Sequence, residues 1–146
     1  MRGSREIAFF VPAAVVVTAD QLTKWWVRHH VPLGTTEPFL GPLRLTHVSN
    51  SGGVFGFTAN PILLALLNAA VLLTLLLLYR RLSSLALRTA LGLVLGGGIG
   101  NLADRLWMGY VTDFVDIRVW DIFNIADASL VVGLLEIIYL LLRGKA

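Results

Sequence analysis

Aspartates near the C-terminal end are the first candidates for chemistry in this 146-residue sequence. A pair of carboxylates can share one proton, so that one group takes a proton from water while the other donates to a carbonyl oxygen. Asp127 is the strongest candidate, because it opens an apolar run and has no cation near it in sequence. Asp113 lies between apolar neighbours, whereas Asp116 and Asp121 look like loop or capping residues. Spacing alone does not choose the pair.

Two further polar groups have helical spacing. Asp20 and Lys24 are four residues apart, which predicts either a structural ion pair or a group that orients a site. Asn101, Asp104 and Arg105 also share one helical face. We expect Asp104 to pair with Arg105 as a structural pair, because a nearby cation lowers the pKa of an aspartate and makes it a poor general acid.

Other chemistries are poorly supported. The chain has no cysteine, and His29, His30 and His47 lack metal-ligand spacing, so we expect neither a metal nor another cofactor. No Gly-x-Ser-x-Gly motif indicates a serine hydrolase, and no serine is placed beside Lys24 by the sequence. Glycines at spacing four (Gly92, Gly96 and Gly100) predict close helix packing in a bilayer rather than a phosphate loop.

The composition is that of an integral membrane protein. Hydrophobic residues make up 56% of the chain and charged residues only 14%, against about 25% charged in ordinary soluble domains. The sequence predicts one membrane-embedded domain over 1–146, with spans at about 7–28, 61–79, 85–103 and 124–142. A cleaved leader is the alternative for the first span, because basic residues precede it and Val17-Thr18-Ala19 could be a cleavage site.

Two segments are predicted to lie outside the hydrocarbon, residues 30–60 and 107–121. Leu43–Val48 alternates in polarity, and after a glycine-rich turn Val54–Phe57 could form the second strand of a hairpin. We expect the shorter segment to be a loop.

Charge placement predicts the orientation. Seven basic residues fall at one set of span ends, which the positive-inside bias makes cytoplasmic together with both termini: Arg2, Arg5, Arg80, Arg81, Arg88, Arg143 and Lys145. The four tryptophans fall at the opposite ends, as in an interfacial belt: Trp25, Trp26, Trp107 and Trp120. The polar candidates therefore gather at the extracytoplasmic face.

Five motifs, in order, resemble those of bacterial lipoprotein signal peptidase (signal peptidase II). They are Asp20-Gln21-Leu22-Thr23-Lys24, Asn50-Ser51-Gly52-Gly53-Val54-Phe55, Gly97-Gly98-Ile99-Gly100-Asn101-Leu102-Ala103-Asp104-Arg105, Val111-Thr112-Asp113-Phe114 and Phe123-Asn124-Ile125-Ala126-Asp127. The match covers nearly the whole chain. It departs at Val54, where the family usually has a smaller residue.

The resemblance implies an all-α integral membrane protein with four transmembrane helices, a small extracytoplasmic β-sheet and a short loop helix. It implies a plasma-membrane aspartic endopeptidase with a retained first helix, which cuts lipid-modified prolipoproteins on the N-terminal side of the diacylglyceryl cysteine. Asp113 and Asp127 match the family's catalytic positions. Positions that would bind substrate or support this pair are Asp20, Lys24, Asn50, Asn101, Asp104, Arg105 and Asn124. The expected partners are this substrate and membrane lipid, not nucleic acid, and the expected state is a monomer.

Two other classes of function are compatible with the residues alone. Acids in a small membrane protein could serve as a proton or cation site in a transporter or binding protein. A structural four-helix partner is the third possibility. Incubation of the detergent-purified protein with a lipid-modified substrate would separate these three classes, because only a peptidase would cleave the substrate.

Overall fold

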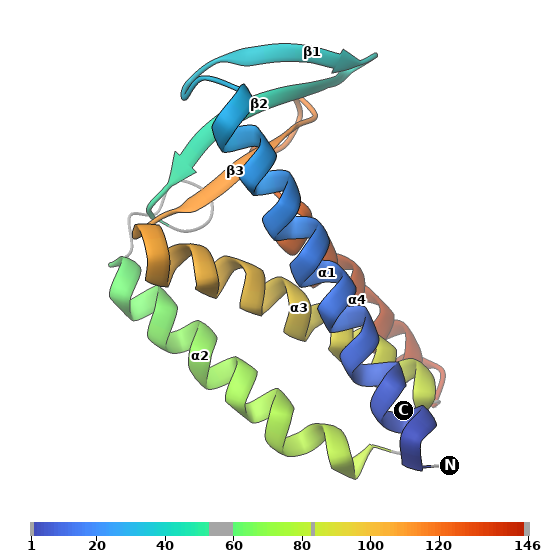
Figure 1. The fold of residues 1–146 in the computed structure, drawn as a ribbon. Coiled ribbons are helices and arrows are strands. Elements are labelled where there is room, and N and C mark those ends of the chain that lie inside the picture. Colours follow the sequence, from blue (N-terminus) through green and yellow to red (C-terminus); the bar gives the residue numbers. More distant parts are fainter. Residues whose placement is uncertain (1, 53–59, 83, 145–146) are drawn as a thin grey trace.

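The computed structural model describes residues 2–52, 60–82 and 84–144, in which four long helices carry a small sheet at one end (Figure 1). These helices are α1 (Arg2–His30), α2 (Pro61–Leu78), α3 (Leu85–Met108) and α4 (Ile125–Leu142), and a short 3₁₀ turn, η1 (Tyr79–Arg81), follows α2. Each of the four is long and apolar enough to cross a membrane. The predicted four-helix membrane fold is therefore confirmed for the described part of the chain.

Local signals in the sequence set the helix ends. Asn60 caps α2 by accepting a hydrogen bond from the Ile62 amide at 2.9 Å, and Pro61 occupies the first turn, where its missing N–H costs nothing. Ser84 caps α3 in the same way. Gly109 ends α3 in the left-handed conformation, with a φ of 79°.

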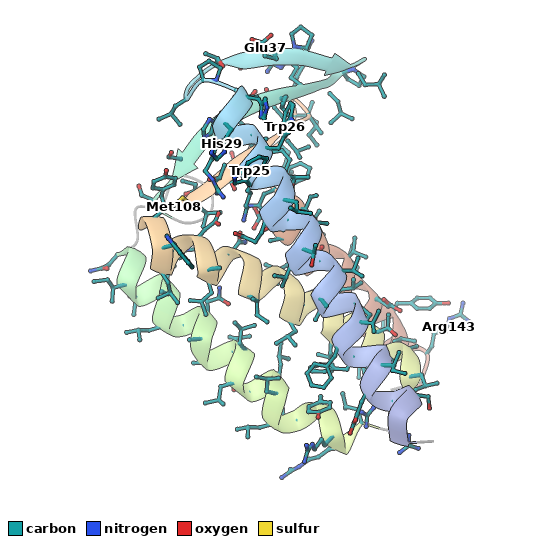
Figure 2. The ribbon with its side chains drawn as sticks, in the orientation of Figure 1. Trp25, Trp26, His29, Glu37, Met108 and Arg143 are labelled. Carbon is teal, nitrogen blue, oxygen red and sulfur yellow. The ribbon has the colours of Figure 1, made fainter. Side chains whose placement is uncertain are left out.

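Helix α3 is the centre of the bundle, and the other three helices pack on it (Figure 1). The chain crosses the bundle in alternating directions, so both termini lie at one end, here called the terminal end. The opposite end carries the sheet and is called the sheet end. Trp25 and Trp26 lie at the sheet end and Arg143 at the terminal end (Figure 2).

Glycines allow this close packing around α3, as their spacing predicts. A β-carbon at Gly96 would lie 2.7 Å from the backbone oxygen of Ala13 on α1. One at Gly100 would lie 2.6 Å from a carboxylate oxygen of Asp20. The glycine stripe therefore brings α1 against α3 and also leaves room for a charged side chain between them.

The sheet has three antiparallel strands in the described residues, in the order β1 (Thr36–Leu40), β2 (Leu43–Asn50) and β3 (Val111–Asp116). It docks on the end of α1 through a small apolar cluster made by Val27, Val31 and Phe114. This docking places the side chains of β3 over the ends of α3 and α4.

Several boundaries differ from the sequence prediction. Helix α3 extends past Ala103 to Met108, and the expected loop 107–121 contains strand β3. The strand Leu43–Asn50 pairs with Thr36–Leu40 on one side and with β3 on the other. The predicted second hairpin strand, Val54–Phe57, and the departure at Val54 lie outside the described residues. No short helix is assigned within residues 31–52 or 109–124.

Candidate active site

Asp113 and Asp127 come together from different elements at the sheet end. Asp113 lies in the middle of β3, and only 3% of its surface is exposed. Asp127 lies in the first turn of α4 and is half-buried. Among the residues that the structure describes, neither carboxylate makes an ion pair within 4.0 Å. Both acids are therefore available for proton transfer rather than locked to a cation.

Asn124 joins the two carboxylates. Its side-chain amide nitrogen lies 2.6 Å from Oδ1 of Asp113 and donates to it. Its side-chain oxygen accepts from the Asp127 amide at 2.9 Å, and its own backbone amide donates to Oδ2 of Asp127 at 3.3 Å. This reciprocal pair is the capping box of α4. The signal that begins the helix thus also fixes the position of both acids.

Asn101 holds Asp127 from the other side. Its amide nitrogen donates to Oδ1 of Asp127 at 2.7 Å, and its oxygen accepts from Lys24 at 3.0 Å and from Asn124 at 3.2 Å. These bonds fix which end of the Asn101 amide is the donor. The carboxylate of Asp127 therefore faces amide donors on two sides.

Lys24 is the centre of the supporting network, and its side chain is completely buried. Its ammonium group lies 2.8 Å from Asp20, 3.1 Å from Asp104 and 3.0 Å from the Asn101 oxygen. Three donors thus meet three acceptors, which is the full capacity of a lysine. The predicted Asp20–Lys24 ion pair is confirmed. Asp20 also accepts from the backbone amide of Ala126 at 2.9 Å, so it ties α1 to α4.

The expected Asp104–Arg105 pair is wrong. Asp104 is paired with Lys24, and the Arg28 guanidinium lies 3.8 Å away. Consecutive residues of a helix point about 100° apart, so the two side chains diverge. Arg105 is half-buried and interacts through its charge with Asp127 and Asp113 as well as with Asp104. Its positive charge thus acts on the two carboxylates from beyond ion-pair distance.

Asn50, at the end of β2, completes the surroundings of Asp113. Its side-chain amide donates to Oδ2 of Asp113 at 2.9 Å, so each carboxylate oxygen of Asp113 faces one amide donor. Burial raises the pKa of Asp113 to about 6, and the negative charge of Asp127 adds to this effect, although the two amide donors oppose it. A carboxyl group with such a pKa can gain or lose a proton close to neutral pH.

Thr112, Gln21 and Arg28 belong to the site but were not predicted as functional. Thr112 donates its backbone amide to Asp104 at 3.1 Å, and its hydroxyl accepts from Arg28 at 3.1 Å. Gln21 donates to Asp104 and to the Gly100 carbonyl, each at 3.1 Å. Thr112 and Gln21 lie inside the motifs of the resemblance, beside residues that were selected. Their motifs therefore contained the information, but a neutral side chain costs less near hydrocarbon than a charged one and is not marked as a functional candidate by its type.

The two other candidate aspartates have different surroundings. Asp116 binds Arg44 and accepts from the Arg118 amide at 2.7 Å, and this amide holds the pKa of Asp116 below its usual value. Asp121 is exposed. No group of three or more His, Cys, Asp or Glu side chains in the described residues is arranged to hold a metal ion. Asp113 and Asp127 thus share Asn124 and make no ion pair within 4.0 Å among the described residues.

The comparisons with known proteins agree with one another. The family model described as signal peptidase (SPase) II matches residues 12–143. A lipoprotein signal peptidase of Moorella thermoacetica is 39% identical over 139 residues, which cover 92% of each chain. One of Dehalococcoides mccartyi is 38% identical over 149 aligned positions, which cover 97% of this chain and 93% of the relative. A solved bacterial membrane enzyme superposes with a TM-score of 0.86 at 28% identity, covering 93% of this chain and 88% of that one.

Proposed function

Because this chain belongs to the signal peptidase II family of membrane proteases, we propose that it is an aspartic endopeptidase that removes signal peptides from prolipoproteins. In this proposal the substrate carries diacylglycerol on a cysteine, and the cut falls on the N-terminal side of that cysteine. Asp113 and Asp127 are the catalytic residues.

One observation carries the aspartic assignment. Asp113 and Asp127 are held around a single residue, Asn124, and their carboxylates also accept from the side-chain amides of Asn50 and Asn101. Amides orient each carboxylate, and no cation among the described residues is in ion-pair contact with either to hold it ionised. The acids Asp20 and Asp104, in contrast, are paired with Lys24 and therefore act as supports.

The chemistry follows from a pair that holds one proton. The ionised carboxylate takes a proton from a water molecule, and the water oxygen attacks the scissile carbonyl carbon. The protonated carboxyl group donates to the carbonyl oxygen as it becomes tetrahedral. When the intermediate collapses, the C–N bond breaks and a proton passes to the leaving nitrogen of the cysteine. Atoms and charge balance with water as the only co-reactant.

The position of the pair suits such a substrate. A signal peptide is itself an apolar helix, so its protease must act where a membrane helix meets the surface. Asp127 lies in the first turn of α4, and Asp113 lies in the sheet just beyond it. The basic residues at the terminal end favour a cytoplasmic location for that end. We therefore place the protein in the bacterial plasma membrane, with both termini cytoplasmic and the site near the extracytoplasmic face.

Reporter fusions test this orientation. Fusions at positions 45 and 115, both in the sheet, should report an extracytoplasmic location. A cytoplasmic signal at either position would contradict the orientation while leaving the chemistry open.

A cleavage assay with purified components tests the activity. The monomeric protein in detergent with added membrane lipid, without nucleic acid, metal or other cofactor, should cut a diacylglyceryl prolipoprotein and expose the modified cysteine as the new N-terminus. Mass spectrometry of both products locates the cut. A substrate without the diacylglyceryl group is the matched control and should be cut far more slowly. No cleavage, or a cut at another bond, would reject the proposal and favour a transporter or a structural protein.

A further inference from the structure

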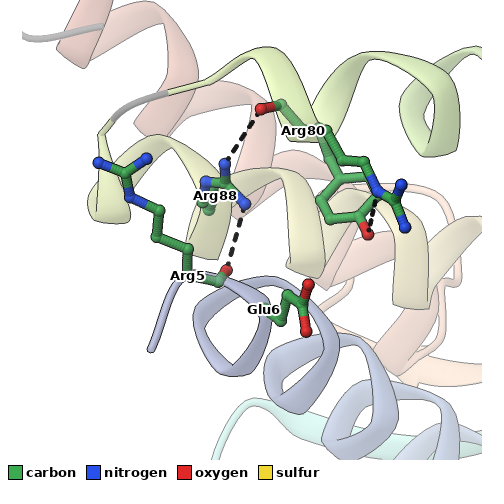
Figure 3. Close-up of a pocket in the computed structure, with 5 residues that line it drawn as sticks. Arg5, Glu6, Arg80 and Arg88 are labelled. Atoms are coloured by element: carbon green, nitrogen blue, oxygen red, sulfur yellow. Dashed lines mark hydrogen bonds between the residues drawn. The ribbon is translucent and has the colours of Figure 1, made fainter. Parts of the chain in front are cut away.

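A second polar site lies at the terminal end of the bundle, at the opposite end from Asp113 and Asp127. It is a cavity of about 380 Å³ between the start of α1, the turn η1 and the start of α3. Its lining side chains include three arginines, one acid and one tyrosine: Arg5, Arg80, Arg88, Glu6 and Tyr79 (Figure 3). The volume lies within the range of small-ligand pockets, about 300–1,000 Å³. Nothing in the proposed peptidase reaction uses these residues.

Arg88 is the unusual member of this group, because only 4% of its surface is exposed. Its guanidinium donates to the Leu82 carbonyl at 2.6 Å and 3.0 Å. It also donates to the carbonyls of Arg5 and Arg80, each at 3.4 Å (Figure 3). Carbonyl oxygens satisfy the donors, but they carry no net charge. Within the described residues no carboxylate lies within 4.0 Å of this cation. A buried positive charge thus remains without a counterion.

The other cavity residues add positive charge. Arg5 and Arg80 are exposed at the rim, and neither makes an ion pair in the part of the chain that the structure describes. Arg80 donates through Nε to the Tyr79 hydroxyl at 3.1 Å, and its two terminal nitrogens have no hydrogen-bond partner among the described residues, so they can face the cavity. Glu6 offsets one of the three cations. The cavity therefore favours an anion, and planar guanidinium groups suit a phosphate especially well.

The surroundings of the cavity indicate a lipid rather than a free ion. The adjoining faces of α1 and α2 expose apolar side chains, among them Ile7, Phe10 and Leu77. One wall is aromatic, because Tyr79 stacks on Phe9 with ring centroids 4.4 Å apart. An anionic group beside an apolar helix surface is the arrangement of a phospholipid, whose phosphate lies at the membrane surface above its acyl chains.

We propose that the cavity lined by Arg5, Arg80 and Arg88 binds the phosphate of an anionic phospholipid at the terminal end of the bundle. The phosphate supplies the counterion that Arg88 lacks, and the two rim arginines close around it. The acyl chains lie along the exposed faces of α1 and α2. This binding does not depend on the proposed peptidase activity.

Lipid retention by the full-length protein in detergent tests this site. Native mass spectrometry should detect phosphatidylglycerol bound at lower lipid concentration than phosphatidylcholine. Arg5→Gln and Arg80→Gln should each weaken phosphatidylglycerol retention about fivefold, because one basic residue near a membrane surface contributes roughly that much. Both changes are at exposed positions, so the fold does not depend on them as it does on Arg88.

Arg143→Gln is the matched control. Arg143 is exposed at the same end and lies 5.4 Å from the ring of Tyr139, as Arg80 lies 5.8 Å from that of Tyr79, but it does not line the cavity. Its loss should change retention less than twofold. Equal weakening by Arg143→Gln and Arg80→Gln would show a diffuse charge effect and overturn the proposal. Displacement of the lipid by millimolar inorganic phosphate would also overturn it, because the cavity would then be a site for free anions.

Discussion

The side-chain amide of Asn124 lies 2.6 Å from a carboxylate oxygen of Asp113, and both residues are buried. The same asparagine begins α4 and binds Asp127 through its backbone and its side chain. Helix formation and alignment of the two acids therefore depend on one residue.

The first prediction concerns this asparagine. Asn124→Ala should lower kcat/KM by about 10- to 150-fold, because loss of a donor to a buried charged group costs about 1.5–3 kcal/mol. The reason is misalignment of Asp113 and Asp127, so KM should change much less than kcat. Steady-state kinetics with a lipid-modified substrate measures both constants.

Asn68→Ala is the control for that change. Asn68 donates to the Gly98 carbonyl at 2.9 Å and does not hydrogen-bond to either acid, so its loss should lower stability without a selective fall in kcat. Equal kinetic effects of the two substitutions would contradict an alignment role for Asn124.

The second prediction concerns the pH dependence of stability. The pKa of Asp113 is raised to about 6 in the folded protein, so between about pH 4 and pH 6 the folded state holds a proton that the unfolded state has released. Stability should therefore fall as pH rises through this range. Between pH 4 and pH 7, the free energy of unfolding of the wild-type protein should fall by about 2 kcal/mol more than that of the Asp113→Asn variant. Parallel stability profiles of the two proteins would show that the pKa of Asp113 is not raised.

The third prediction concerns the buried lysine. Lys24→Met should lower the free energy of unfolding by about 3–5 kcal/mol, because it leaves Asp20 and Asp104 buried with their main cation removed. Arg44→Met is the matched control: the Arg44 side chain is 36% exposed, so breaking its pair with Asp116 should cost about 1 kcal/mol or less. Denaturation in detergent compares the two. Similar losses would mean that the Lys24 network is not a buried support.

The fourth prediction separates Arg105 from Asp104. Because Asp104 is held by Lys24, Arg105→Ala should change the free energy of unfolding by no more than about 1 kcal/mol. Activity should fall about tenfold or more, because a positive charge that acts on Asp113 and Asp127 is lost. Arg105→Lys should keep most of the activity. A large loss of stability with unchanged turnover would instead make Arg105 a structural residue.

Much of the fold could be predicted from the sequence, because long apolar runs and their caps are local signals. Pro61 and Asn124 mark helix starts where the structure has them. Strand β3 was missed because its partner β2 lies more than sixty residues away, so neither short segment indicates the pairing alone. The end of α3 was placed too early, because Asp104 looks unsuited to a membrane helix until Lys24 is seen opposite it.

The candidate site was predictable only in part, because many of its contacts join residues that are distant in sequence. Asp20 and Lys24 share one helix, so spacing was enough to pair them. The partners of Asp104 come from α1 and from β3, and adjacency in sequence pointed instead to Arg105. Contacts between helices, unlike those within one helix, leave no fixed spacing in the sequence.

The most direct test of the account is cleavage by the single variants Asp113→Asn and Asp127→Asn. Asparagine keeps the shape of aspartate but cannot exchange the proton, so each variant should remain folded, bind the lipid-modified substrate and fail to cut it. The double variant should be little worse than either single one, because the two residues act as a unit. Asp116→Asn, on the same strand but paired with Arg44, should keep most of the activity. Near-normal turnover by either Asp113→Asn or Asp127→Asn would contradict the assignment of the catalytic pair.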